Sequence, residues 1–475
     1  MTIIELIDAA PIHNIMGALA FNADKIIYVG SENKNIFENN RKNKIENFYR
    51  KKGLENVSFE YVQISKADFN DVRTKLNKIV AENESCYFDI SGGEDIVLSA
   101  LGFVFAENPD IHLYKVNPET KRIYLFESQT DADGNRKIVN SKILTDIQNT
   151  VEENILAHGG TVVYDTEKPG STHIWQFSVD FIKDLRQMWE ICCYGPNEKN
   201  SNKNKNNNNN DKQSHPRMWN SIISTLEKLQ EINNSKNENE LQVNIEYAKN
   251  YLKKRGGYTI TDGYLHALQR AMLISFGENN SDEVLHIVFK NEQVKLCLTK
   301  AGTVLELKTY FACEKLLKDE FTDCMTGVAI DWDGVVHKEA TTAQEYEKLD
   351  VQARINNIED TKNEVDVILM KGLIPYFISC KNGKFTSEEL YKLYTVKEKF
   401  GTEYGKMFIV TTDFDKSDYE FNLEHLSQRA ADMGIEIIKN VHLMTDAEFE
   451  EELSVKLKKS EKNTAQSQNK KKCIR

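Results

Sequence analysis

The chain has 475 residues, of which 40% are hydrophobic and 28% are charged. This length predicts two or three domains, and the composition is typical of globular protein and excludes a disordered or collagen-like chain. No apolar run approaches the roughly 18 residues that a membrane span needs, and the first residues, MTIIE, lack the basic start of a signal peptide. The eight cysteines form no CxxC pair, so neither a zinc site nor a disulfide framework is indicated. We therefore expect a cytoplasmic protein without a membrane partner.

The net charge of −12 argues against nonspecific binding of nucleic acid over the whole surface. A local basic groove can still exist within an acidic protein. Residues 451–475 carry eight Lys or Arg against three Glu, so the sign of the charge reverses at this end. We predict a basic, disordered tail over 451–475, with contact to phosphate as the alternative.

Residues 1–150 alternate short apolar runs with amphipathic segments. The predicted strands are 25–29, 57–63, 86–90 and 111–116, and the predicted helices are 68–81 and 94–106. Strands that alternate with helices predict a parallel sheet covered by helices on both faces. We therefore assign residues 1–150 to one α/β domain.

Residues 151–290 are predicted to form a helical connector. Within it, the segment 197–213 is rich in asparagine and cannot bury apolar surface, which predicts a flexible surface loop. Helices are predicted on either side of this loop, at 219–229, 241–252 and 264–274. A winged-helix version of the connector would bind DNA or transmit motion. Because aromatic side chains at helical spacing more often form core, the pattern favours a plain connector.

Residues 291–450 are predicted to form a second α/β domain. A hairpin is predicted from 283–290 and 293–298, followed by a helix over 302–318. Further strands are predicted at 328–331, 364–370, 376–381, 407–411 and 435–438, and further helices at 387–400 and 422–433.

The stretch 363–383, NEVDVILMKGLIPYFISCKNG, is predicted to form two strands around a tight turn. Because side chains alternate between the faces of a strand, Glu364 and Asp366 share a face. Ser379 and Lys381 share a face on the next strand, and pairing can bring Asp366 beside Lys381. An aspartate on an apolar strand is costly unless a cation compensates it, and Mg²⁺ or Mn²⁺ prefers such oxygen ligands. The alternative from the residues alone is a buried Asp–Lys pair without catalysis.

Together these residues resemble the core of a PD-(D/E)xK nuclease, in which an aspartate on one strand and acid-x-Lys on the next bind the metal. Glu306, in the predicted helix 302–318, matches the first-helix glutamate of that superfamily. The blocks IDWDG, NEVDVILMKG and FISCKNG resemble, more narrowly, the nuclease domain of CARF-type effectors of type III CRISPR systems, which cyclic oligoadenylate activates. This resemblance covers 302–412. It implies that Glu306, Asp366 and the backbone carbonyl of Cys380 bind Mn²⁺ or Mg²⁺.

The resemblance also implies a catalytic site made of Asp366, Lys381, Glu364 and Ser379, in which Lys381 orients the attacking water or stabilises developing charge. Ser379 departs from the pattern, because the superfamily has an acid there. Serine is a poor metal ligand, so the missing charge must come from elsewhere, and Glu306 and Glu364 are the candidates. Asp331 and Asp333 are further possible acids, although Asp333 precedes a glycine and that pair commonly forms a turn.

Two loops in the first domain carry small residues directly after strands, DAAPIHN at 8–14 and DISGGED at 89–95. Small residues there let backbone N–H groups approach a phosphate at a helix N-terminus, and plain turns are the alternative. CARF domains are Rossmann-like dimers that bind cyclic oligoadenylate across their two-fold axis, through the loops after the first and fourth strands. The resemblance therefore implies ligand contacts from Pro11, Ile12, His13, Asn14, Ser91, Gly92, Gly93 and Glu94. For His13, a capping or core role is the alternative.

The expected fold is α/β, with an N-terminal Rossmann-like CARF domain, a helical connector and a C-terminal restriction-endonuclease-like PD-(D/E)xK domain. The resemblance implies a homodimeric, metal-dependent nuclease of antiviral defence, activated by cyclic oligoadenylate and most naturally by cyclic tetra-adenylate. Its substrate would be single-stranded DNA or RNA, or duplex DNA. Two alternatives stay open. Ser379 favours a non-enzymatic CARF-type regulator whose degenerate nuclease fold binds nucleic acid. An unrelated partner domain would instead give a constitutive DNA-repair or restriction-type nuclease.

Overall fold

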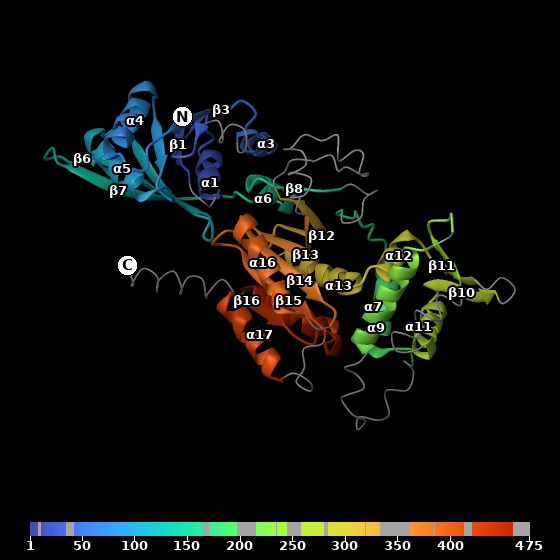
Figure 1. Cartoon of the computed structure of the whole chain (residues 1–475). Coiled ribbons are helices and arrows are strands. Elements are labelled where there is room, and N and C mark those ends of the chain that lie inside the picture. Colours follow the sequence, from blue (N-terminus) through green and yellow to red (C-terminus); the bar gives the residue numbers. More distant parts are fainter. Residues whose placement is uncertain are drawn as a thin grey trace.

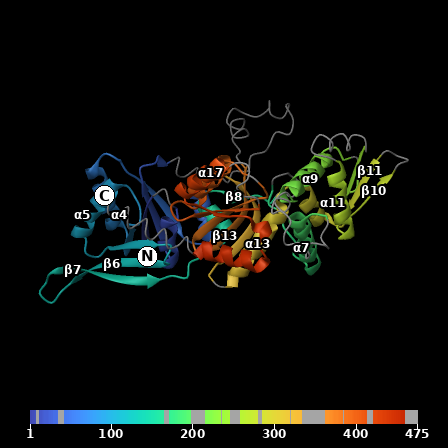
Figure 2. The same cartoon turned by 90° about the horizontal axis from the view of Figure 1, so that it is seen from below.

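The computed structural model of the chain describes residues 1–7, 11–34, 42–164, 171–196, 215–233, 235–244, 258–279, 284–318, 320–332, 362–383, 385–412 and 420–458. The described strands form a seven-stranded, a three-stranded and a six-stranded sheet. The six-stranded sheet lies between the other two in both views (Figure 1, Figure 2). The Asn-rich segment 197–213, Asp333 and residues 459–475 lie outside the described residues. Within the described ranges, no helix has the length and apolar character needed to cross a membrane.

The N-terminal sheet is parallel where the sequence alternates strands with helices, as predicted. Its order is β3-β2-β1-β4-β5-β6-β7. The parallel strands are β1 (Thr2–Leu6), β2 (Lys25–Gly30), β3 (Ser58–Gln63), β4 (Cys86–Asp89) and β5 (His112–Asn117). An antiparallel hairpin, β6 (Arg122–Thr130) and β7 (Arg136–Leu144), extends the sheet and was not predicted. The strand order reverses between β1 and β4, the position at which open α/β sheets bind ligands.

Helices cover both faces of this sheet (Figure 1). α1 (His13–Ala20) and α3 (Asn43–Lys51) pack on one face, and α4 (Phe69–Glu82) and α5 (Asp95–Glu107) pack on the other. β1 shows why the sequence permits this. Ile3 packs in the core beneath α1 and α3, whereas Ile4 and Leu6 pack in the core beneath α4 and α5. A strand that is apolar on both faces is typical of a parallel sheet buried between helices.

The six-stranded sheet carries the Asp366–Lys381 hairpin at its centre. Its order is β16-β15-β14-β13-β12-β8. Its strands are β8 (Thr161–Val162), β12 (Asp323–Asp331), β13 (Lys362–Lys371), β14 (Ile374–Lys381), β15 (Lys406–Thr411) and β16 (Ile435–Ile438). α13 (Thr303–Glu314) packs on one face, and α6 (Val151–Ala157), α16 (Ser387–Phe400) and α17 (Glu420–Asp432) pack on the other. α6 and β8 come from the start of the range 151–290, yet they belong to this sheet.

The part of the connector that is described combines helices with a small antiparallel sheet of order β10-β11-β9. Its elements are α7 (Val179–Tyr194), α9 (His215–Gln230), β9 (Glu240–Asn244), α11 (Tyr258–Arg270), β10 (Ile274–Asn279), β11 (Val284–Phe289) and α12 (Glu292–Thr299). A sheet of this kind is what the winged-helix version of the connector requires.

Two predictions in this region are wrong. Residues 241–244, expected to begin a helix, form β9, because Leu241 and Val243 alternate into the core beside β11. Residues 293–298, expected to form the second strand of a hairpin, form α12 instead. The side chain of Asn291 accepts a hydrogen bond from the backbone N–H of Val294 at 2.9 Å and so begins a helix. β11 pairs with β9 and β10, which supply the partners that the hairpin lacks.

Gly17, on α1, lets that helix lie directly against β5. A Cβ atom at position 17 would overlap the ring of Tyr114. Tyr114 is fully buried, and its hydroxyl donates a hydrogen bond to Oε1 of Glu5 at 2.9 Å. A shift of the ring would therefore strain a buried hydrogen bond.

We expect Gly17→Ala to destabilise the N-terminal domain by about 1–3 kcal/mol, because overpacking a full core forces side chains from their preferred positions. Gly102 lies on α5 with open space around its Cα, so Gly102→Ala is the matched control. That variant should gain about 0.5–1 kcal/mol from helix propensity. Urea unfolding, followed by hydrogen exchange in β1 and β5, measures both. If the amides of β1 and β5 were equally protected from exchange in Gly17→Ala and Gly102→Ala, the packing argument would be contradicted.

Candidate functional site

The candidate site forms where β13 and β14 separate. The two strands are joined by a turn at Gly372, whose φ is +61°. Their pairing begins with Lys371 opposite Ile374 and ends with Val367 opposite Ile378. Beyond that point Asp366 leaves the pairing. Its Oδ2 accepts hydrogen bonds from the backbone N–H of Cys380 at 2.5 Å and from the hydroxyl of Ser379 at 3.2 Å. The hairpin thus fixes a carboxylate beside the FISCK segment, as the sequence indicated.

Glu306 brings a second carboxylate to the same place from α13. Its side chain is 8% exposed. It accepts no hydrogen bond from any described residue, and its nearest charged groups include Asp366, Lys300 and Lys381. Burial and then the proximity of Asp366 raise the pKa of Glu306 well above its ordinary value. Burial also raises the pKa of Asp366, although Lys381 opposes the shift. The negative charge of Asp366 therefore disfavours the ionised form of the buried Glu306.

Two lysines lie beside these acids, and each has a carboxylate partner. Lys300, just before α13, contacts Glu364 of β13. Lys381, at the end of β14, lies with Nζ 2.9 Å from Oε2 of Glu389. Burial alone would lower the pKa of Lys381, but Asp366 and Glu389 outweigh burial and raise the pKa above its ordinary value. The lysine is thus held as an ammonium ion between two acids.

The structure brings together Asp366, Ser379, Cys380, Lys381 and Glu306. Glu364 lies nearby and is engaged by Lys300. Asp331 lies elsewhere, since it pairs with Lys362, four residues along β13 from Asp366. Sequence analysis missed Glu389. Its position in the first turn of α16 predicts only an interaction with the helix dipole.

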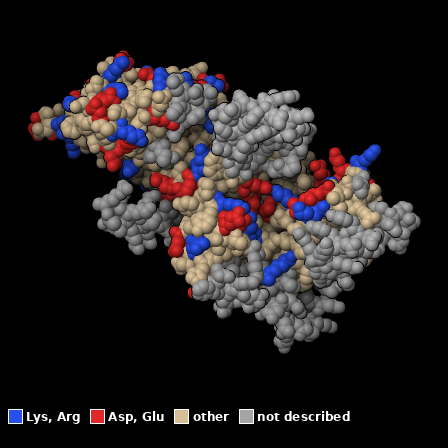
Figure 3. All heavy atoms as spheres, viewed as in Figure 1, with Lys and Arg blue, Asp and Glu red and all other residues tan. Residues whose placement is uncertain are grey.

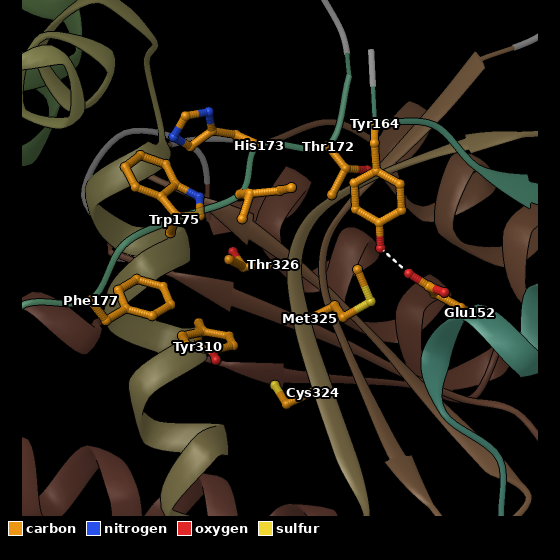
Figure 4. A pocket seen from close by; sticks show the side chains of 11 residues that line it. Glu152, Tyr164, Thr172, His173, Trp175, Phe177, Tyr310, Cys324, Met325 and Thr326 are labelled. Carbon is orange, nitrogen blue, oxygen red and sulfur yellow. Dashed lines mark hydrogen bonds between the residues drawn. The ribbon is translucent and has the colours of Figure 1, made fainter. Parts of the chain in front are cut away.

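An apolar pocket of about 450 Å³ lies beside this site, at the edge of β12 (Figure 4). Aromatic side chains from 164–177 and α13 line it, and Tyr164 donates a hydrogen bond to Glu152 at one end. Thr326 links the pocket to the site, because its hydroxyl donates to the carbonyl oxygen of Asp366 at 3.1 Å. No residue predicted to bind metal or ligand lines this pocket.

The two predicted ligand loops meet at the carboxyl ends of β1 and β4. Gly93, with φ of +102°, lies so close to Leu6 of β1 that a Cβ atom would approach the Leu6 Cβ to 2.8 Å. Asn14 donates hydrogen bonds to the carbonyl of Leu6 at 2.9 Å and to Glu5 at 3.3 Å. Ser91 is held by Asp89, which accepts from its backbone N–H at 2.7 Å. Polar contacts therefore fix both loops to adjacent strand ends.

The other predicted contact residues differ in exposure. Ile12, His13 and Asn14 are buried. Pro11, Ser91, Gly92, Gly93 and Glu94 are partly exposed. Glu94 accepts a hydrogen bond from the hydroxyl of Ser31 at 2.7 Å and lies 3.3 Å from Nζ of Lys66.

His13 joins the N-terminal domain to the six-stranded sheet. Its Nε2 lies 2.8 Å from the hydroxyl of Tyr404, and the two rings meet edge to face with centroids 5.5 Å apart. Glu403 approaches the same nitrogen at 3.7 Å. Tyr404 lies between α16 and β15, so a residue of the first ligand loop contacts the connection that follows α16.

Glu5 and Asp89 form a buried acid pair beneath the ligand loops. Both are at most 1% exposed. Burial and the neighbouring Asp89 raise the pKa of Glu5 well above its ordinary value, and burial raises the pKa of Asp89 to about 6 against the hydrogen bonds from Ser91. The folded domain therefore keeps protons that the unfolded chain releases. The free energy of unfolding of the domain therefore falls as the pH rises. The fall begins near pH 4, about the ordinary pKa of a carboxyl group, and continues through the raised pKa values of the folded state.

We expect Glu5→Gln to raise the melting temperature by about 2–4 °C at pH 8, because an amide needs no proton to be buried. Its oxygen can still accept from Tyr114. The gain should shrink at pH 5, where Glu5 is protonated in the folded wild type. Calorimetry at both pH values measures this. Glu5→Leu is the control, and it should destabilise because Tyr114 loses its acceptor. An identical melting temperature for wild type and Glu5→Gln at pH 8 would disprove the acid-pair argument.

No family model matches the sequence, and no curated protein matches it. Two solved structures resemble it over nearly the whole chain. Protein VC1899 from Vibrio cholerae has 15% identity and a TM-score of 0.61, over 97% of this chain and 98% of that one. Can2 from Sulfobacillus thermosulfidooxidans, solved in complex with cyclic tetra-adenylate, has 13% identity and a TM-score of 0.57, over 95% of this chain and 98% of that one. These likenesses confirm the expected α/β fold with its Rossmann-like N-terminal domain.

Proposed function

We propose that this chain is a metal-dependent nuclease of type III CRISPR defence that cyclic oligoadenylate activates. The observation that carries the proposal is the meeting of Glu306, Asp366 and Lys381 where β13 and β14 separate. The likeness to Can2 along almost the entire chain supports it, since Can2 was solved with cyclic tetra-adenylate bound. The proposal divides the chain into a sensor (1–150), a connector (151–290), a PD-(D/E)xK-like nuclease domain (291–450) and a basic tail (451–475).

The residues of the site fit Mg²⁺ or Mn²⁺. Burial and the charge of Asp366 raise the pKa of Glu306, and burial and the charge of Glu364 raise the pKa of Asp366, so a divalent cation would relieve repulsion among these carboxylates. The backbone carbonyl of Cys380 is a third oxygen ligand in this proposal. Among the described residues, no group of three or more His, Cys, Asp or Glu surrounds one metal position. Mg²⁺ needs no such group, because it usually keeps several waters and takes one or two carboxylates.

A bound cation of this kind lowers the pKa of a coordinated water and neutralises charge on the phosphate. Lys381 holds its ammonium beside Asp366, where it orients the attacking water by donating a hydrogen bond to it. Ser379 donates to Asp366 and so keeps one carboxylate oxygen in a fixed direction. Glu364 holds Lys300 near Glu306 and Asp366, where its ammonium could contact phosphate.

The proposed substrate is nucleic acid, as single-stranded DNA or RNA or as duplex DNA. Acidic and basic side chains are intermixed over the described part of the face shown in Figure 3. Phosphate would therefore be bound locally by Lys300 and Lys381 rather than by a broad basic surface.

In the sensor, we place cyclic oligoadenylate, with cyclic tetra-adenylate first, across a homodimer axis at the loops after β1 and β4. The proposed contacts are Pro11, Ile12, His13, Asn14, Ser91, Gly92, Gly93 and Glu94. The ligand can activate the nuclease only by binding two arrangements of the chain with different affinity. The contact of His13 with Tyr404 supplies a physical connection between ligand loop and nuclease domain.

A second candidate is a non-enzymatic regulator that binds nucleic acid without cutting it. Ser379 favours it, because a hydroxyl replaces the acid expected at that position. Metal-dependent cleavage separates the two candidates.

We expect Asp366→Asn and Lys381→Ala each to slow Mn²⁺-supported cleavage about 100-fold or more, since the first removes a proposed cation ligand and the second removes the ammonium that orients the water. Labelled single- and double-stranded DNA and RNA, incubated with cyclic tetra-adenylate, give the measurement. Lys371→Ala is the control for the lysine, because Lys371 lies at the opposite end of the same hairpin and contacts Glu320. Cleavage that survives EDTA would exclude metal dependence. A wild-type protein that binds but never cuts would favour the regulator.

Tyr404→Phe tests the connection between the two domains. It keeps the ring against His13 and removes only the hydroxyl. We expect the ratio of cleavage with and without cyclic tetra-adenylate to fall about fivefold, since one hydrogen bond contributes about 1 kcal/mol of coupling. Tyr394→Phe, at an exposed position of α16, is the control and should leave the ratio unchanged. If Tyr404→Phe leaves the ratio unchanged too, the coupling does not pass through His13.

A further inference from the structure

We propose that Glu389, on α16, is a positioning residue of the nuclease site and supplies beside Lys381 the negative charge that Ser379 lacks. This inference rests on the proposed function and names a further residue of the same site. Three observations carry it: the neutral side chain at position 379, the contact of Glu389 with Lys381, and the engagement of the other candidate acids.

An acid at position 379 would lie naturally beside Lys381. The two positions share one face of β14, because side chains two residues apart on a strand point the same way. Ser379 is 8% exposed, and its hydroxyl donates to Asp366 at 3.2 Å. Ser379 donates a hydrogen bond to Asp366 but carries no charge. Lys381 therefore has no acid beside it at position 379 of its own strand.

Glu389 faces Lys381 from the neighbouring helix. Its Oε2 lies 2.9 Å from Nζ of Lys381, and the side chains of the two residues are 25% and 28% exposed. Because α16 packs against β14, Glu389 is held by a helix rather than by a loop. Its second oxygen lies 3.8 Å from Nζ of Lys392, on the same helix. The carboxylate is therefore fixed between the two lysines.

The acids that the sequence offered as replacements are engaged elsewhere. Glu364 contacts Lys300. Glu306 lies on α13, on the opposite face of the sheet from α16, where its strongest charge interaction is with Asp366. Lys381 is thus flanked by Asp366 and Glu389, and its charge is shared between them.

This arrangement has a consequence for cation binding. An unneutralised Lys381 would oppose the attraction of Glu306 and Asp366 for a divalent cation. Glu389 offsets the lysine charge and keeps the ammonium from folding onto Asp366, so both carboxylates stay available. Removing the Glu389 charge should therefore weaken cation binding even though Glu389 does not touch the cation.

Mn²⁺ binding to the full-length protein without nucleic acid, followed by electron paramagnetic resonance, tests this directly. Single-turnover cleavage with cyclic tetra-adenylate is measured in parallel. We expect Glu389→Gln to weaken Mn²⁺ binding about 10-fold, as loss of an outer partner typically does, and to slow cleavage similarly. Adding Ser379→Asp to Glu389→Gln should restore both to within a few-fold of wild type. Glu388→Gln is the matched control, because Glu388 lies on the same turn, is 71% exposed and contacts only Lys392 among the described residues.

Rescue by Ser379→Asp separates a charge effect from damage to α16, because an acid on β14 cannot repair helix packing. If Glu389→Gln binds Mn²⁺ and cleaves like wild type, the inference is wrong and the proposed function stands. If Glu389→Gln is impaired and Ser379→Asp does not restore it, Glu389 is only a structural residue. If the wild type neither binds Mn²⁺ nor cleaves, the proposed function fails and the inference fails with it.

Discussion

Two carboxylates, the buried Glu306 and the partly buried Asp366, lie within reach of each other's charge where β13 and β14 separate, and the surrounding residues have to offset that repulsion. Taking a charge out of water is costly, and placing two like charges together costs more. The hairpin offsets part of this by directing the N–H of Cys380 and the hydroxyl of Ser379 at Asp366. Lys381 and Lys300 bring positive charge from two sides. A fold selected for stability alone would not keep this pair, so its presence favours a cation-binding role.

The N-terminal domain also buries two acids together, with a different outcome. Glu5 and Asp89 are buried together, but Tyr114, Asn14 and Ser91 surround them with hydrogen-bond donors. There burial raises the pKa of both acids, which favours their protonated forms, and their hydrogen bonds with Asn14 and Ser91 hold the two loops at neighbouring strand ends. In the six-stranded half of the molecule, Glu306 has no such donor among the described residues. The two pairs therefore differ in their donors and also in exposure, since Glu5, Asp89 and Glu306 are buried whereas Asp366 is partly exposed.

The spacing of apolar residues predicted the helices and strands whose formation depends on their own sequence. The helix at 387–400 and the strand at 435–438 match α16 and β16, because their apolar periodicity is clear. The prediction of a strand at 293–298 was wrong because a short apolar stretch fits either a strand or a helix. The cap at Asn291 was the signal that could have decided it.

In the candidate site, Asp366 and Lys381 could be predicted because a hairpin brings nearby residues together. Glu389 could not be predicted, because its role depends on how α16 packs against β14. The contact of His13 with Tyr404 joins residues 391 positions apart, a separation at which sequence periodicity carries no information.

The connection between the N-terminal domain and the six-stranded sheet limits how such proteins could be recombined. The backbone N–H of Asn149 donates to the carbonyl of Gly372 at 2.9 Å, and Asn154 donates to the carbonyl of Phe400 at 2.8 Å. β8 then becomes the edge strand beside β12. The stretch that looks like a linker is therefore built into the six-stranded sheet. In a chimera, α6 and β8 would have to come from the same protein as the rest of the six-stranded sheet. N-terminal domains could therefore be exchanged between relatives only at a junction before Asn149.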